Sequence, residues 1–151
     1  MRRILLLSAL ALLATSASAQ LPGLRKRTGP PGTQQGAPLS GIDALRADFA
    51  TRSGGDTVFF GIGSAVLGAP ARATLAAQAM WLRQHPEVVV RVEGYGDAGD
   101  TGDHALALGA RRAEEVRDYF VLLGVRSAQL STTSWGKERP GSPRAVTVLV
   151  R

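Results

Sequence analysis

The sequence predicts an α+β domain in which a short leading helix is followed by elements in the order β-α-β-α-β-β. Two segments, residues 70–84 and 104–122, repeat apolar residues at helical spacing. Four shorter segments are rich in β-branched residues or alternate in polarity, as strands do. Only the turn GKERPGSP separates the last two strands, which is too short for a crossover, so we expect these strands to run antiparallel.

The N-terminal segment, residues 1–19, has the features of a secretory signal peptide. Arg2 and Arg3 precede an apolar run at residues 4–14, and the segment ends in the A-x-A pattern of residues 17–19. The apolar run is too short to span a bilayer. We therefore expect export, with cleavage after Ala19.

Residues 20–40 are rich in Pro, Gly, Gln and Ser and have no periodic apolar face, which predicts a flexible linker. The cluster of Arg25, Lys26 and Arg27 within it is a solvated tail or a weak contact for an anionic polymer or membrane. From residue 44 onward, 13 Lys and Arg face 11 Asp and Glu, a balance of +2. This near neutrality argues against nucleic-acid binding.

The sequence contains no cysteine. Disulfides, thiolate metal sites and a cysteine nucleophile are therefore excluded. We also expect no lipid anchor of the bacterial lipoprotein type, which requires a cysteine at the cleavage site.

The domain, residues 41–151, is expected to begin with a short helix over IDALRADFA, followed by a strand at residues 56–60. GIGSAVLGAP then forms a loop, and Pro70 suits the first position of the next helix because its missing N–H has no helical partner to lose. The predicted apolar face of the first helix consists of Ile42, Leu45 and Phe49. That of the second consists of Leu75, Ala79 and Leu82.

In the second half, strands are expected at residues 87–93, 129–135 and 145–151. Asp103 is a candidate N-cap for the helix at 104–122, and Gly124 is placed to end it. Its expected apolar stripe consists of Leu106, Ala113, Val116 and Phe120. The first of these strands alternates, with Val88, Val90 and Val92 on one face; in the last, Val146, Val148 and Val150 alternate with Thr147 and Leu149.

The motif GYGDAG, residues 94–99, matches the spacing of a dinucleotide-binding loop. Its context does not fit, because the helix is expected to start about five residues after the motif and Asp118, about 20 residues further on, falls inside that helix. Asp97, Asp100 and Asp103 also put negative charge where a pyrophosphate would bind. We therefore expect no nucleotide cofactor here.

Metal binding and catalysis have little support in the sequence. The three loop aspartates recur every third residue without a closing Glu, whereas calcium loops use tighter spacing. His85 and His104 flank different helices, and no Ser lies in a nucleophile elbow. We expect no metal, no cofactor and no enzymatic activity.

Residues 56–151 resemble the OmpA-like peptidoglycan-binding domain of outer-membrane protein A and of the Pal lipoprotein. The resemblance rests, in order, on VFF, SAVL, LAAQAMWLRQHP, VVVRVEGYGD, LALGARRAEEVRDYFVLLGV and SWGKERP. The most specific part is E-G-x-x-D followed by L-G-x-R-R-A. The resemblance implies one mixed four-stranded sheet packed against two long helices.

The resemblance also implies a non-catalytic periplasmic protein, associated with peptidoglycan and the outer membrane, that binds the diaminopimelate-containing stem peptide. Asp97 matches the family aspartate, suited to an ammonium group, and Arg112 matches the arginine, suited to bidentate binding of a carboxylate. Tyr95, Gly94 and Leu108 are further expected site residues. The expected partners are peptidoglycan and, in addition, another envelope protein.

Several residues depart from the family pattern near this site, among them Gly61 and Gly63, where the family often carries an Asp. The family has His where this chain has Tyr95, Gly where it has Asp100, and Asn where it has Ala105. The segment before the last strand is also shorter. These departures favour an alternative, a degenerate module that no longer binds peptidoglycan and serves as a protein-interaction domain of the cell envelope.

Overall fold

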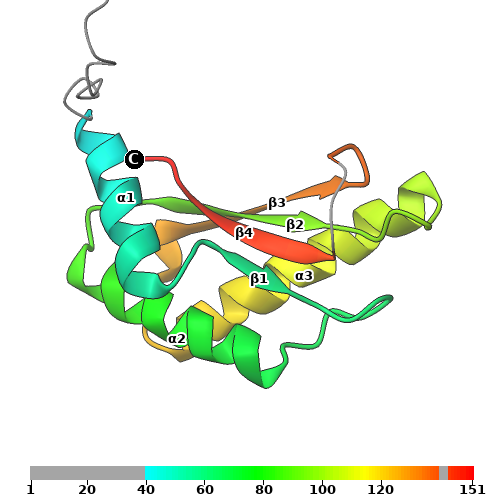
Figure 1. Ribbon diagram of the computed structural model, residues 1–151, viewed down its shortest axis with the longest axis horizontal. Helices are drawn as coiled ribbons and strands as arrows, with labels where there is room; N and C mark the ends of the chain where they lie inside the picture. Colours follow the sequence, from blue (N-terminus) through cyan, green and yellow to red (C-terminus); the bar gives the residue numbers. More distant parts are fainter. Residues whose placement is uncertain (1–39, 140–142) are drawn as a thin grey trace, which may run out of the picture. The chain divides into compact units, whose positions relative to one another are not determined.

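The computed structural model describes residues 40–139 and 143–151, and its elements follow the predicted order (Figure 1). The predicted signal peptide and linker lie outside the described residues, apart from Ser40. The elements are α1 (Gly41–Ser53), β1 (Thr57–Phe59), α2 (Ala69–Gln84), β2 (Val90–Tyr95), α3 (Gly102–Leu122), a 3-10 turn η1 (Ser127–Gln129), β3 (Leu130–Gly136) and β4 (Arg144–Leu149).

The four strands form one mixed sheet in the order β1-β4-β2-β3. β2 pairs in parallel with β3 and antiparallel with β4, and β4 pairs antiparallel with β1. β3 and β4 therefore run in opposite directions, as predicted, but they are not neighbours. β2 lies between them, so the short connection spans the width of the central strand.

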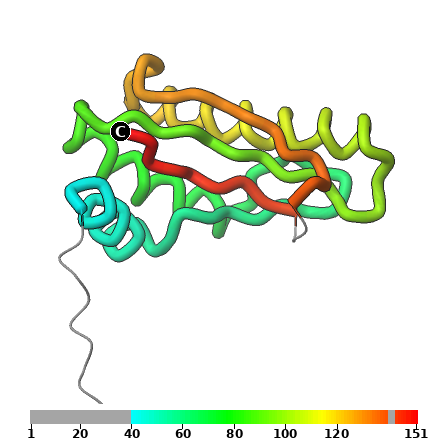
Figure 2. The backbone as a smooth tube through the Cα atoms, turned by 90° about the horizontal axis from the view of Figure 1, so that it is seen from above, coloured from blue at the N-terminus to red at the C-terminus, as the bar shows by residue number. Residues whose placement is uncertain are grey.

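The helices α2 and α3 cover one face of the sheet, and the opposite face is open over β3, β2 and β4 (Figures 1 and 2). The core lies between these layers. Its largest fully buried apolar side chains come from all parts of the domain: Phe49, Leu75, Leu82, Val88, Val90, Val92, Val116, Phe120 and Leu149. This confirms an α+β sandwich with a single core.

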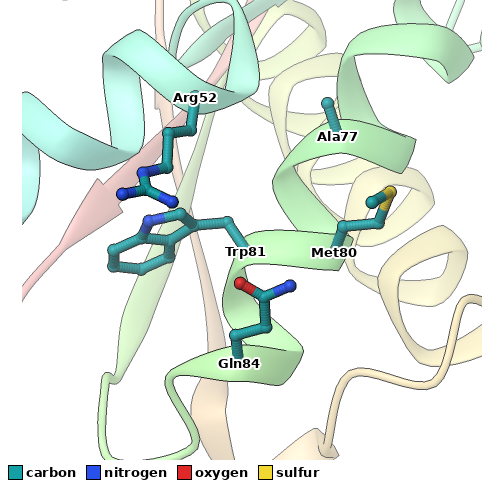
Figure 3. A pocket seen from close by; sticks show the side chains of 5 residues that line it. All are labelled: Arg52, Ala77, Met80, Trp81 and Gln84. Carbon is teal, nitrogen blue, oxygen red and sulfur yellow. The ribbon is translucent and has the colours of Figure 1, made fainter.

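α1 is joined to α2 through Trp81. The Trp81 ring meets Phe49 edge-on at 5.1 Å and stacks on His85 at 3.8 Å, and its indole N–H donates to Asp48 at 2.8 Å. A surface cavity of about 210 Å³ lies beside Trp81 and is lined by Arg52, Ala77, Met80, Trp81 and Gln84 (Figure 3). Arg52, at the edge of this cavity, pairs with Asp48 at 2.8 Å.

Helix α3 is capped differently from the prediction at its start and as predicted at its end. Thr101, rather than Asp103, is the N-cap, and Asp103 lies in the first turn. At the other end, Gly124 has a φ of 85°, the Gly124 N–H donates to Val121 O and the Val125 N–H to Phe120 O. These two bonds form a Schellman motif, which accounts for the glycine.

One expectation about buried faces was wrong, and the structure shows which side of the last strand faces the core. Leu106 is 49% exposed, and the buried stripe of α3 instead includes Ala105 and Leu108. In β4 the residues turned to the core are Ala145, Thr147 and Leu149. The valines face the open side, because Thr147 can enter the core by donating its hydroxyl to Gln78 Oε1 at 2.9 Å.

Candidate functional site

Asp97 and Arg112 meet at one end of the sheet. Asp97 lies in the loop after β2, and Arg112 lies in the middle of α3. The distance from Arg112 Nη2 to Asp97 Oδ1 is 2.8 Å. The two residues that the sequence singled out are therefore in direct contact, although 15 positions separate them along the chain.

The Arg112 side chain is fully buried, with 0% of its surface exposed. Its three nitrogens donate to three backbone carbonyls: Nε to Ser64 at 2.8 Å, Nη1 to Tyr95 at 2.7 Å and Nη2 to Gly61 at 3.0 Å. A guanidinium has five N–H groups, so one N–H on each Nη remains. Arg112 thus ties β2 and the β1–α2 loop (residues 60–68) to α3.

The Asp97 carboxylate uses its two oxygens differently. Oδ2 accepts a short hydrogen bond from the Gly63 N–H. Oδ1 lies 2.8 Å from Arg112 Nη2 and forms a buried ion pair with the guanidinium. Burial alone would raise the pKa of Asp97, but the Gly63 amide and the Arg112 guanidinium outweigh burial and hold this pKa below its ordinary value.

The β1–α2 loop covers this ion pair with backbone groups and exposes apolar side chains above it. Gly61 and Ser64 supply carbonyls to Arg112, and Gly63 supplies its amide to Asp97. Ile62 is 88% exposed and Val66 is 73% exposed. Figure 1 shows that this loop reaches the same end of the sheet as the β2–α3 loop.

Small residues let β2 and α3 approach closely enough to form the pair. A Cβ on Gly94 would lie 1.9 Å from Gly109 O, and one on Gly96 would lie 2.3 Å from Ala105 O. Ala105 is itself fully buried. Gly94 and Ala105 therefore serve close packing between the strand and the helix.

The other expected site residues, Tyr95 and Leu108, do not both place their side chains beside the ion pair. The Tyr95 carbonyl accepts from Arg112, but the Tyr95 ring lies on the open face of the sheet, where its hydroxyl donates to Glu93 at 3.0 Å. Leu108 is buried on α3 one turn before Arg112. Tyr95 thus contributes its backbone to the site, whereas its side chain belongs to another cluster.

Of the remaining loop acids, Asp100 has protein partners of its own. Asp100 Oδ2 lies 2.9 Å from His104 Nδ1, and Lys137 Nζ donates to the Asp100 carbonyl at 2.9 Å. Within residues 40–139 and 143–151, no group of three or more His, Cys, Asp or Glu side chains is arranged to hold a metal ion. None of the helices in that part of the chain combines the length and hydropathy of a membrane span.

The sequence did not single out Gly61, Gly63 and Ser64 as site residues. They act through backbone atoms, which any residue has, so their type carries little signal. The one available hint is the glycine pair in GIG, because the Gly63 φ of 65° favours glycine.

The order β-α-β-α-β-β, with one sheet backed by two helices and a buried arginine–aspartate pair at one end, defines a class of small α+β sandwich domains. Residues 59–148 match the model of the OmpA family. The chain belongs to the OmpA family.

Its relatives include two proteins named peptidoglycan-associated lipoprotein. The one from Rhizobium meliloti is 37% identical over 163 aligned residues, covering 97% of this chain and 85% of the relative. The one from Mesorhizobium japonicum is 49% identical over 86 residues, covering 57% of this chain and 51% of the relative. The latter match thus spans about half of that protein.

Among solved structures, the peptidoglycan-associated lipoprotein from Burkholderia pseudomallei superimposes with a TM-score of 0.62. It is 33% identical, and the match covers 64% of this chain and 92% of that structure. The C-terminal domain of Helicobacter pylori MotB, at 22% identity and a TM-score of 0.58, shares the fold.

Proposed function

We propose that this protein is a non-catalytic peptidoglycan-binding module that acts in the periplasm, in association with the cell wall and the outer membrane. Its membership of the OmpA family and its similarity to proteins named for their association with peptidoglycan support this proposal. The predicted signal peptide is consistent with this location.

The proposed ligand is the diaminopimelate side chain of the stem peptide, which presents an ammonium and a carboxylate on one carbon. Asp97 Oδ1 is a buried carboxylate oxygen whose neighbouring donor group is the Arg112 guanidinium at 2.8 Å, and a ligand ammonium would be a second cationic donor to this carboxylate. The two remaining Arg112 N–H groups suit the carboxylate. This buried pair of a carboxylate and a guanidinium, which together match an ammonium and a carboxylate, is the observation that carries the proposal.

Access to both groups requires the β1–α2 loop to move. Arg112 is fully buried, and the Asp97 residue is 8% exposed. A ligand carboxylate would reach the remaining N–H groups of Arg112 once residues 61–64 of the loop move aside, and the Gly63 amide would be released from Asp97 or shared with the ligand. Binding is thus proposed to open a site that is closed without ligand.

Co-sedimentation with purified peptidoglycan tests the proposal. Asp97→Asn keeps the size of the side chain and an acceptor for the Gly63 amide but removes the charge, so we expect its binding to fall by about tenfold or more. Asp103→Asn, an exposed acid of the same region, is the matched control and should pellet like the wild type. Equal pelleting of all three proteins would contradict the site assignment.

The chemistry of the ligand can be tested with a second peptidoglycan. Lysine-type peptidoglycan keeps a side-chain ammonium but lacks the carboxylate of diaminopimelate. We expect the protein to pellet with the diaminopimelate type and several-fold less with the lysine type. Equal binding to both polymers would exclude the proposed carboxylate contact with Arg112.

A second candidate function is an OmpA-family module that has lost peptidoglycan binding and binds another envelope protein. The full burial of Arg112 under three carbonyls favours it, because the arginine then has a purely structural role. Ligand-induced stabilisation separates the two candidates. A true site at a stem-peptide concentration of about 100 Kd should add about 2.7 kcal/mol of stability, and a lost site should add none.

A further inference from the structure

The open face of the sheet carries a cluster of arginines and aromatic rings that the proposed peptidoglycan site does not use. We call it the outer arginine cluster. In Figure 2 the strands β3, β2 and β4 lie in front of α2 and α3, so the reader looks onto this open face. The cluster consists of Arg91, Glu93, Tyr95, Trp135, Arg139 and Arg144.

A buried carboxylate organises this cluster. Glu93 is only 4% exposed, although it lies on the open face. Its Oε1 accepts from Arg91 at 2.8 and 3.1 Å, and its Oε2 accepts from the Tyr95 hydroxyl at 3.0 Å. Burial would raise the pKa of Glu93, but these hydrogen bonds hold it below its ordinary value, so the carboxylate stays charged at neutral pH.

The other two arginines lie over aromatic rings. The Arg139 guanidinium is 3.9 Å from the centre of the Trp135 ring, and the Arg144 guanidinium is 4.1 Å from that of Tyr95. Stacking fixes the plane of a guanidinium and leaves its N–H edge free for a bidentate partner. Both cations are therefore preorganised.

Positive charge on this face exceeds negative charge. The cluster holds three guanidiniums and one carboxylate, Glu93, which Arg91 approaches to 2.8 Å and Arg139 to 3.6 Å. Arg144 has no ion-pair partner in the part of the chain that the structure describes, which includes every Asp and Glu of the sequence. In the adjacent turn, Lys137 and Glu138 offset each other, so the excess remains two positive charges.

An apolar side chain adjoins these cations. Phe59 on β1 is 61% exposed and pairs in register with Arg144 on β4. Along the open sheet, a partner would therefore meet an apolar contact and then two oriented guanidiniums. This combination suits a peptide better than a free anion.

We propose that the outer arginine cluster binds an acidic segment of a partner protein, with carboxylates on Arg139 and Arg144 and an apolar side chain on Phe59. Charge complementarity identifies the occupant. A second copy of this chain packing by the same face would oppose like charges, which disfavours it. The proposal is independent of peptidoglycan binding, since the Asp97–Arg112 pair shares with this face only Tyr95, whose ring and carbonyl point to different groups.

The test is an NMR titration of the 15N-labelled full chain with octaglutamate as the acidic probe and octaglutamine as the neutral probe. The indole N–H of Trp135 is one of two in the sequence and serves as the local reporter. We expect saturable shifts there and at Arg91 and Arg144 with octaglutamate, weakened by added salt. Octaglutamine should produce none.

The test variant is Arg139→Gln/Arg144→Gln, and the matched control is Arg83→Gln/Arg111→Gln, which removes the same charge from exposed positions on α2 and α3. We expect the test variant to bind octaglutamate about tenfold more weakly and the control to bind like the wild type. Circular dichroism should show both variants folded. Equal weakening by the two variants would overturn the proposal.

Two further outcomes would also overturn it. One is binding to phosphatidylglycerol vesicles, but not to octaglutamate, with the same dependence on Arg139 and Arg144, which would assign the face to a lipid surface. The other is loss of peptidoglycan pelleting in the Arg139→Gln/Arg144→Gln variant, which would assign it to the polymer. Unchanged pelleting of this variant is the expected result, and it holds whether or not Asp97 and Arg112 bind peptidoglycan.

Discussion

Gly94 of β2 and Gly109 of α3 lie back to back, so close that a Cβ on Gly94 would be 1.9 Å from the Gly109 carbonyl oxygen. A Cβ on Gly109 would in turn lie 2.4 Å from Ser134 Oγ. The backbones of the strand and the helix are thus in direct contact at this point. This contact fixes the distance between α3 and β2, and therefore the position of Arg112, which lies one turn further along α3.

We therefore predict that Gly94→Ala destabilises the protein by about 3 kcal/mol or more, because neither backbone can move without separating α3 from the sheet. Urea unfolding followed by circular dichroism measures this change. The control is Gly99→Ala, where nothing lies within 4 Å of the new methyl group, and we expect a change within about 0.5 kcal/mol. Similar stabilities for the two variants would contradict the close packing.

The second prediction concerns Arg112. Arg112→Gln removes the guanidinium from three carbonyls and leaves Asp97 buried without its counter-charge, so we expect a loss of about 3–5 kcal/mol in the free energy of unfolding. Arg111→Gln, the exposed neighbour on the same helix, should change stability by less than about 0.5 kcal/mol. Chemical denaturation of both variants checks this, and a stable Arg112→Gln protein would refute the structural role.

The third prediction is a pH dependence that belongs to Asp97. Its folded-state pKa is lowered, so this group stabilises the folded state above the ordinary Asp pKa of 3.8. The contribution is lost as the pH falls through 3.8 towards the folded-state pKa. We expect the stability of Asp97→Asn to fall less steeply than that of the wild type below pH 3.8, by at most about 1.4 kcal/mol per pH unit.

Unfolding curves measured at several pH values between neutrality and the acid transition give this slope. Asp48 and Glu93 also have lowered pKa values, so Asp97→Asn should retain part of the acid sensitivity. Identical slopes for the wild type and Asp97→Asn would mean that the Asp97 carboxyl is not held charged by its neighbours.

The fourth prediction uses the exposed tip of the β1–α2 loop. Ile62→Asp places a negative charge above the proposed carboxylate position, so we expect peptidoglycan pelleting to fall by about fivefold or more without loss of stability. Met80→Asp, at a 63% exposed position on α2, is the control and should pellet normally. Normal pelleting of Ile62→Asp would place the ligand elsewhere.

The sequence was sufficient for the elements because they rest on local signals, whereas the Asp97–Arg112 pair was expected from the family resemblance. The helical spacing of apolar residues predicts α2 and α3, and Pro70 and Gly124 indicate where α2 begins and α3 ends. The family motif identifies Asp97 and Arg112 as candidate site residues. Strand adjacency was not predictable in the same way. Only the register between β2 and β4 reveals that β3 and β4 are separated by a strand.

The errors have physical causes as well. Leu106 is apolar but lies on the solvent side of α3, and the small Ala105 is buried instead because β2 approaches so closely there. The contacts of Gly61, Gly63 and Ser64 with the ion pair depend on backbone atoms, to which residue type gives no guide. Tyr95, an expected site residue, contacts Arg112 through its carbonyl, which its residue type could not indicate.

The three carbonyl bonds of Arg112 have a consequence for how such chains are compared. A descendant that abandoned its ligand would still keep this arginine, since the architecture collapses without it. Counting the arginine across genomes would therefore overestimate the number of functional receptors. The same holds for the acid, because the charge of Asp97 pairs with Arg112 and stabilises the folded state even where no ligand is bound.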